Sequence, residues 1–143
     1  MESAEGPVTR VPDSELDYDE ELTYRWHGGL FTGVGYDDAS PSGLSEVSYR
    51  YGLQDGPARD WYPSGALKGE SQFREGVQHG IAREYAEDGE VRSEAVYEYG
   101  ILLSKSERAE DGQFREVYRL AEESPNRGLL ERLRGDKGWP EIG

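Results

Sequence analysis

The chain has 143 residues, among them 16 lysines and arginines and 30 aspartates and glutamates, so its formal net charge at pH 7 is −14. This length suits one domain with a modest core. The acidic balance argues against nucleic acid or an anionic membrane as the main ligand, since phosphate contacts need clustered lysine and arginine, and the lack of cysteine excludes disulfides and thiolate zinc sites.

The first segment, residues 1–15, is polar, and we expect it to be flexible. It has no basic start followed by an apolar run, which a secretory signal needs, and no apolar run in the chain approaches the roughly 20 residues of a membrane helix. The expected location is the cytoplasm. The acidic run Asp13–Glu21 is interpreted as a solvated segment or as a docking arm that orders on binding.

The next segment, residues 16–120, is a tandem repeat with a period of about 24 residues. Two copies are clear, a degenerate copy precedes them, and a decaying copy follows, as expected for the ends of a stacked array. Glycines recur with the period, and so does a glutamate three residues before an aromatic residue. The repeated positions are Gly52, Gly76 and Gly100; Gly56 and Gly80; Gly65 and Gly89; and Glu21/Tyr24, Glu46/Tyr49, Glu70/Phe73 and Glu94/Tyr97.

Each copy predicts one β-hairpin. The sequences RDWYPSGALKGE and REYAEDGEVRSE carry a glycine turn between flanks rich in aromatic and β-branched residues. Because a lone hairpin cannot bury its apolar face, we expect the copies to stack so that the aromatic rings of each cover those of the next. The predicted fold is mainly β, a meander of stacked antiparallel hairpins.

A turn centred on Ser64 fixes the expected register. Alternation along the strands then places Arg59 and Trp61 on one face of the sheet and Asp60, Lys68 and Glu70 on the other. The expected cross-strand pairs are Trp61 with Leu67, Asp60 with Lys68, Tyr85 with Val91, and Glu84 with Arg92.

The last segment, residues 121–143, predicts a short capping helix and a tail. Ser124 is a suitable N-cap and Pro125 suits the first helical position, while Leu129, Leu130 and Leu133 form one apolar stripe. We expect this helix to cover the open end of the sheet and to protect its edge strand. Trp139, in the tail, is either a partner contact or folds back on the helix.

The stretch from Tyr51 to Leu102, YGLQDGPARDWYPSGALKGESQFREGVQHGIAREYAEDGEVRSEAVYEYGIL, resembles the MORN-variant repeats of bacterial antitoxins of the YwqK family. The segments LTYRWHGGLFTGVGYD and LLERLR fit that family as well, so the resemblance spans roughly residues 8–134. It implies a cytoplasmic antitoxin or immunity protein that binds a partner toxin. MORN-type arrays are generally non-enzymatic scaffolds, and this chain differs from the lipid-binding ones in its strong acidity.

The candidate functional groups are the repeated carboxylates. We expect Glu46, Glu70 and Glu94 to lie in line across adjacent hairpins, with Asp60 and Glu84 beside them. Three interpretations of this row are open. It is a solvated face neutralised by neighbouring arginines and lysines, or an acidic surface that binds a basic partner, or a source of general acid and base groups. The candidate partner-binding residues are Asp60, Glu70, Glu84 and Glu94, with Trp61 and Tyr85 if the aromatic face is open.

The two histidines, His27 and His79, each precede a glycine, and we expect both to be solvated turn residues. They have no metal-ligand spacing, and no phosphate-binding loop occurs, so no metal or cofactor is expected. The leading hypothesis is a binding protein of antitoxin or immunity type that occludes a basic protein, such as a toxin. The alternatives are a small tailoring enzyme with an aromatic-lined pocket and carboxylate acid/base groups, and a non-enzymatic assembly scaffold.

Overall fold

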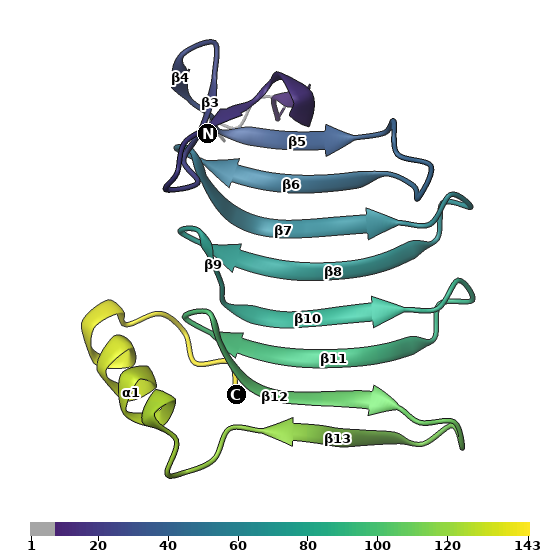
Figure 1. Ribbon diagram of the computed structural model, residues 1–143, viewed down its shortest axis with the longest axis vertical. Helices are drawn as coiled ribbons and strands as arrows, with labels where there is room; N and C mark the ends of the chain where they lie inside the picture. Colours follow the sequence, from purple (N-terminus) through teal and green to yellow (C-terminus); the bar gives the residue numbers. More distant parts are fainter. Residues whose placement is uncertain (1–7) are drawn as a thin grey trace, which may run out of the picture.

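The computed structural model describes residues 8–143 and consists of one long sheet, a small sheet and one helix (Figure 1). The large sheet has ten strands in the order β1-β5-β6-β7-β8-β10-β11-β12-β13, with β9 paired to β8, and the small sheet is β2-β3-β4. The strands are β1 (Arg10–Pro12), β2 (Asp17–Tyr18), β3 (Tyr24–Trp26), β4 (Gly29–Leu30), β5 (Gly33–Asp37), β6 (Ser45–Arg50), β7 (Leu53–Trp61), β8 (Leu67–Arg74), β9 (Val77–Gln78), β10 (Gly80–Tyr85), β11 (Val91–Glu98), β12 (Ile101–Arg108) and β13 (Phe114–Arg119). The predicted meander of antiparallel hairpins is confirmed; only the β1–β5 pair is parallel within residues 8–143.

Two-residue turns recur along one side of the sheet with the 24-residue period. Their first residue has a φ near +50° and their second is glycine, which is the type I′ geometry that matches the twist of paired strands. Backbone of this kind favours glycine because a side chain is strained there. The turns are His27–Gly28, between β3 and β4 of the small sheet, and Tyr51–Gly52, Glu75–Gly76 and Tyr99–Gly100 in the large sheet.

A side chain placed before each of the last three turns accepts the N–H of the first turn residue. Asp55 Oδ2 accepts from Glu75 N at 3.1 Å, and His79 Nδ1 accepts from Tyr99 N at 3.0 Å. The residues of the second hydrogen bond stand one repeat after those of the first. Thr32 Oγ1 does the same for Tyr51 at 2.9 Å. The repeat therefore reproduces hydrogen bonds as well as strand positions.

Three-residue loops connect β7 to β8, β10 to β11 and β12 to β13 on the opposite side, where residues 38–44 connect β5 to β6. In the loop closed by Gly89, the glycine N–H donates to Ala86 O at 2.9 Å, and Ala86 N donates to Glu90 O at 2.8 Å. This is a type I turn followed by a left-handed glycine, a loop that places a bulge at the end of the hairpin. The loops closed by Gly65 and Gly112 have the same pattern.

The bulge changes the expected register. Trp61 does pair with Leu67, and Tyr85 with Val91, as predicted. Beyond the bulge, however, Asp60 pairs with Gly69 instead of Lys68. In the next hairpin, Glu84 likewise pairs with Ser93 instead of the expected Arg92.

The expected face assignment fails for the same reason. Arg59 and Glu70 lie directly opposite one another and so share a face, while Asp60, their neighbour in sequence, lies on the other. Glu70 was expected beside Asp60. A slip of one residue moves a side chain to the opposite face of a sheet.

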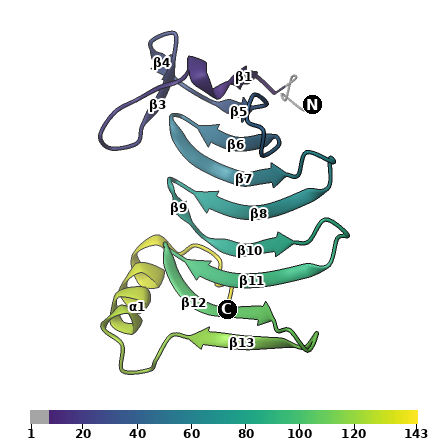
Figure 2. The ribbon, with the colours of Figure 1, turned by 45° about the vertical axis from the view of Figure 1, so that its right-hand side comes forward.

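Within residues 8–143, the large sheet is a single layer, and clusters of buried apolar residues lie at its two ends (Figure 2). Trp61 and Tyr85 are half-buried and belong to neither cluster, so the expected stack of rings filling the middle of the repeat is absent from residues 8–143. The N-terminal cluster contains Val11, Leu16, Phe31 and Tyr49, and the C-terminal cluster contains Tyr99, Ile101, Leu103, Leu120, Leu130 and Trp139.

The two ends of the chain only partly follow prediction. Residues 1–7 of the expected flexible segment lie outside the described residues, and its remaining part is built into the fold as β1, paired with β5, and a short 3-10 turn at Asp13–Glu15. At the other end, α1 (Pro125–Lys137) begins where expected, with Ser124 Oγ accepting from Asn126 N at 3.2 Å.

The helix does not protect the edge strand, contrary to expectation. It buries Leu130 against the C-terminal cluster, whereas every residue of β13 is exposed. A bulge in the β12–β13 pairing and the charges of Arg115, Glu116 and Arg119 guard that edge instead.

Candidate functional site

One face of the sheet carries a row of alternating charges, which we call the ladder: Glu46, Arg59, Glu70, Arg83 and Glu94. These residues are successive cross-strand partners on β6, β7, β8, β10 and β11. Arg59 forms an ion pair with Glu70, and Arg83 Nε binds Glu94 at 2.7 Å. Hydrogen bonding to Glu94 raises the pKa of Arg83 above its ordinary value. The expected line of three glutamates thus exists, but arginines separate them, and each glutamate has an arginine partner, since Arg10 Nη2 binds Glu46 at 2.9 Å.

The other face carries the neighbouring row, in which carboxylates alternate with very small residues. Cross-strand partners along it are Asp60 on β7, Gly69 on β8, Glu84 on β10 and Ser93 on β11. Asp60 and Glu84 are two strands apart, which is about 9–10 Å at ordinary strand spacing. Both are exposed, and neither forms an ion pair within residues 8–143. The acidic excess in the middle of the sheet therefore lies on this face.

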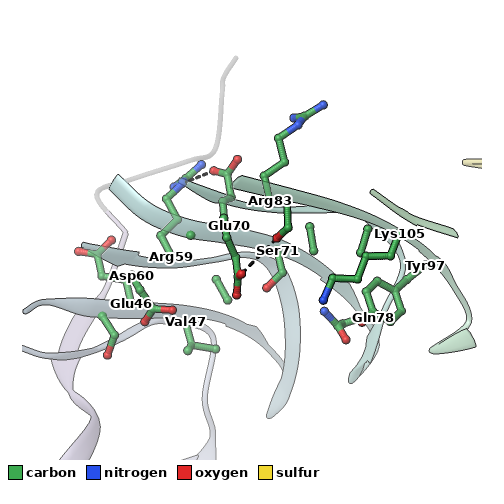
Figure 3. Close-up of a pocket in the computed structure, with 17 residues that line it drawn as sticks. Glu46, Val47, Arg59, Asp60, Glu70, Ser71, Gln78, Arg83, Tyr97 and Lys105 are labelled. Atoms are coloured by element: carbon green, nitrogen blue, oxygen red, sulfur yellow. Dashed lines mark hydrogen bonds and ion pairs between the residues drawn. The ribbon is translucent and has the colours of Figure 1, made fainter. Parts of the chain in front are cut away.

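A hollow of about 360 Å³ lies over this row and is called here the central hollow. Its floor consists of short side chains, including Ala58, Ser71, Ala82 and Ala95, which allow another chain to approach the sheet closely. Figure 3 shows Arg59, Glu70 and Arg83 directed to one side of the sheet and Val47, Gln78 and Lys105 to the other. The border of the hollow also includes Asp60, Glu84, Ser93 and Tyr97.

The charges around the hollow are not balanced. Ser93 Oγ donates to Glu84 Oε1 at 3.1 Å, which orients that carboxylate without neutralising it. Lys105 is the one lysine that lines the central hollow, and its Nζ lies 3.2 Å from Glu107 Oε2, so its charge is already matched. A cationic group entering the hollow would meet two uncompensated carboxylates.

The structure separates the predicted site residues. Asp60 and Glu84 share the face of the central hollow, whereas Glu70 and Glu94 are held in ladder pairs on the opposite face. Trp61 and Tyr85 end their strands outside this hollow; Trp61 borders a separate depression with Pro41 and Leu44.

A buried carboxylate that sequence reasoning missed lies under the C-terminal tail. Glu98 has no exposed surface and accepts hydrogen bonds from Arg134 Nε at 2.8 Å and Arg134 Nη2 at 3.0 Å. It also accepts from Ile142 N at 2.8 Å and Gly143 N at 3.1 Å. Burial alone would raise the pKa of Glu98, but these hydrogen bonds outweigh burial and the pKa is lowered.

His79 is also not the solvated residue that was expected. It is 7% exposed, and its Nε2 lies 2.7 Å from the carbonyl of Pro140. Because Nδ1 accepts from Tyr99 N, Nε2 carries the proton and donates. The tail folds back so that the ring of Trp139 stacks on that of Tyr99, with centroids 4.9 Å apart. Of the two expectations for Trp139, the structure therefore shows the folded-back one, in the cluster that also contains Leu130 of the helix. The sequence did contain one indication of the buried carboxylate: Glu98 stands at the repeat position where the two earlier copies have Arg50 and Arg74.

Acid–base chemistry requires a carboxylate whose pKa departs usefully from its ordinary value in an accessible cavity. Glu98 is inaccessible, and its lowered pKa keeps it ionised. Burial and the nearby charge of Asp37 raise the pKa of Asp13, but that residue lies outside the central hollow. The part of the chain that the structure describes contains no group of three side chains suited to hold a metal, and none of its helices is long and apolar enough to cross a membrane.

Comparison with known proteins finds no family model, curated protein or solved structure that the chain matches. We therefore infer the function from the geometry of the two faces of the sheet.

Proposed function

We propose that this protein is a binding module that captures a basic protein partner on the face of the central hollow. The observation that carries the proposal is the contrast between the two faces. Arginines match the glutamates of the ladder, whereas Asp60 and Glu84 face the hollow and form no ion pair within residues 8–143. The excess negative charge is thus directed to one surface.

The shape of that surface supports the same function. The short side chains of its floor let a partner's main chain approach, and the polar groups around them offer hydrogen bonds. Complementary charge accelerates association and excludes acidic competitors, which suits a protein that must block a basic partner quickly. In the cell, the proposed role is that of a cytoplasmic antitoxin or immunity protein that occludes a basic toxin, in line with the MORN-like repeat pattern.

Titration with hexalysine, followed by amide chemical shifts of the labelled chain, tests where cations bind. We expect saturable shifts at Ala58, Asp60, Glu84 and Ser93 that disappear in high salt. The variant Asp60→Lys/Glu84→Lys should abolish them. Glu87→Lys/Glu110→Lys adds the same charge at exposed turn positions and should preserve them.

If the amide shifts occur at the ladder residues instead, or if both double variants lose the shifts equally, the face of the hollow has no special role in cation binding. The partner is then sought by capture from the source cells with the wild-type chain and the two double variants. A basic protein retained by the wild type and the turn variant but lost by Asp60→Lys/Glu84→Lys would be assayed for inhibition of its activity. Such a protein that keeps its full activity in the complex would contradict the antitoxin role.

A further inference from the structure

The C-terminal tail occupies a seat built by one hairpin unit on the face of the ladder. The guanidinium of Arg74 lies 4.9 Å from the centroid of the Trp139 ring, and His79 binds the carbonyl of Pro140. Glu98 accepts the N–H groups of the last two residues. Here an extended segment without regular secondary structure is held by an arginine, a donor and a carboxylate at fixed repeat positions.

An open copy of this seat lies one repeat earlier. Subtracting 24 from Arg74, His79 and Glu98 gives Arg50, Asp55 and Arg74. All three line a hollow of about 820 Å³ that borders the tail at Pro140 and Ile142. We call it the second seat, and its apolar and polar walls are completed by Tyr51, Leu53, Gln72, Phe73 and Glu75.

The backbone of the two seats is the same. Gly100 N donates to Gln78 O at 2.8 Å, and Gly76 N donates to Gln54 O at 2.8 Å. Both turns have the same left-handed backbone, and in both the first turn N–H is accepted by the side chain of the equivalent residue, His79 or Asp55. The second seat is therefore preformed by the repeat.

The chemistry of the second seat is inverted. Where His79 donates to a tail carbonyl, the second seat has Asp55, which can only accept when ionised. Where Glu98 accepts hydrogen bonds from tail N–H groups, the second seat has the guanidinium of Arg74, which donates hydrogen bonds. Arg50 and Arg74 are exposed and form no ion pair with any residue in 8–143, while Asp55 and Glu75 are the acidic groups of the same hollow.

We propose that the second seat binds an extended peptide segment of a partner protein in which a carboxylate side chain adjoins a large apolar one. The carboxylate binds Arg74 and Arg50, since guanidinium groups suit bidentate recognition of carboxylates. The apolar side chain packs on Leu53, beside Tyr51, an aromatic residue that is 68% exposed. Such a ligand is acidic and lies on the opposite face from the basic partner proposed above, so the two proposals stand independently.

The experiment uses the full labelled chain and two capped peptides, acetyl-Gly-Trp-Asp-Gly-amide and its Asn counterpart, which differ only in the carboxylate. We expect the Asp peptide to give saturable amide shifts at Leu53, Gln54 and Phe73, with a Kd on the order of 1 mM. Arg50→Gln should weaken this binding roughly fivefold, the effect of one exposed charge pair. Arg92→Gln removes the same charge from an exposed position outside the seat and should leave the Kd unchanged.

Arg50 takes part in none of the hydrogen bonds and ring contacts that hold the tail in its seat, so the Arg50→Gln variant also separates the two seats. Shifts confined to Trp139 and Ile142 would show that the peptide displaces the tail instead of filling the second seat, and would overturn the proposal. Equal shifts with the Asn peptide, an unaltered Kd in Arg50→Gln, or no saturable shift would overturn it as well.

Discussion

Replacing Glu98 with glutamine removes a charge from a side chain that has no exposed surface while preserving its size. The carboxylate accepts from four N–H groups, two on Arg134 and two on the tail backbone. An amide oxygen can satisfy only about two of them, and the amide NH₂ then faces the remaining donors. The variant therefore loses both hydrogen bonds and the charge partner of Arg134.

The expected loss is about 3 kcal/mol in the free energy of unfolding. Breaking a buried ion pair costs about 3–5 kcal/mol, and the low end applies because the Arg134 side chain is 25% exposed and water can satisfy part of it. With a urea dependence of about 2 kcal/mol per molar, the midpoint falls by roughly 1.5 M. The measurement is urea unfolding followed by tryptophan fluorescence and far-UV circular dichroism.

The matched control is Glu94→Gln, whose partner is Arg83 at 2.7 Å and whose pair is 35–39% exposed. Exposed pairs contribute at most about 1 kcal/mol, so its midpoint should fall by less than about 0.5 M. Because the pKa of Glu98 is lowered in the folded state, its stabilisation is present above the ordinary glutamate pKa and is lost as pH falls through the lowered value. The gap between wild type and Glu98→Gln should therefore narrow in acid. Equal midpoints for the two glutamine variants at neutral pH would refute this account of the tail.

Three further predictions concern single positions. His79→Phe keeps a ring edge-on to Tyr99 and Trp139 but leaves a turn N–H without its acceptor, so unfolding should become easier by about 1–3 kcal/mol, as measured by thermal melting. In the same melts, His27→Asn at an exposed turn should change stability little. Gly89→Ala should cost about 1–2 kcal/mol although no atom lies within 4 Å of the added carbon, because φ is +93°; Gly89→Asn should recover part of the loss in the same melts, and no difference from wild type would contradict a backbone origin. Arg59→Glu places a third carboxylate between two ladder glutamates and should lower the melting temperature in a way that added salt relieves. The double variant Arg59→Glu/Glu70→Arg should restore only part of the loss, because the new carboxylate still faces Glu46 and the new guanidinium faces Arg83.

The glycine spacing was enough to predict the hairpins, because a type I′ turn and a left-handed loop glycine each require a residue that tolerates positive φ. The capping helix was predictable from Ser124 and Pro125 for the same local reason. These features depend on neighbours in sequence. The turns and the helix start can therefore be predicted without knowing the tertiary contacts.

The faces were not predictable from alternation alone. The three-residue loop after Tyr62 carries a bulge, and one extra residue shifts every later pair, which moved Asp60 away from Glu70. The tail sites were missed because they join residues far apart in sequence, such as Glu98 with Arg134 and His79 with Pro140. Only the break in the repeat at Glu98 hinted that this copy has a different neighbour.

The middle hairpins, β7 to β10, have no cluster of buried apolar residues of their own and are joined to the two ends by strand pairing. A whole unit could therefore be duplicated or removed without opening a cavity, provided that the cut falls at equivalent turn glycines such as Gly52 and Gly76. Lengthening the array in this way would extend the row of carboxylates at the same spacing. Evolution could thus match the reach of this protein to partners of different size by counting units, without redesigning either end.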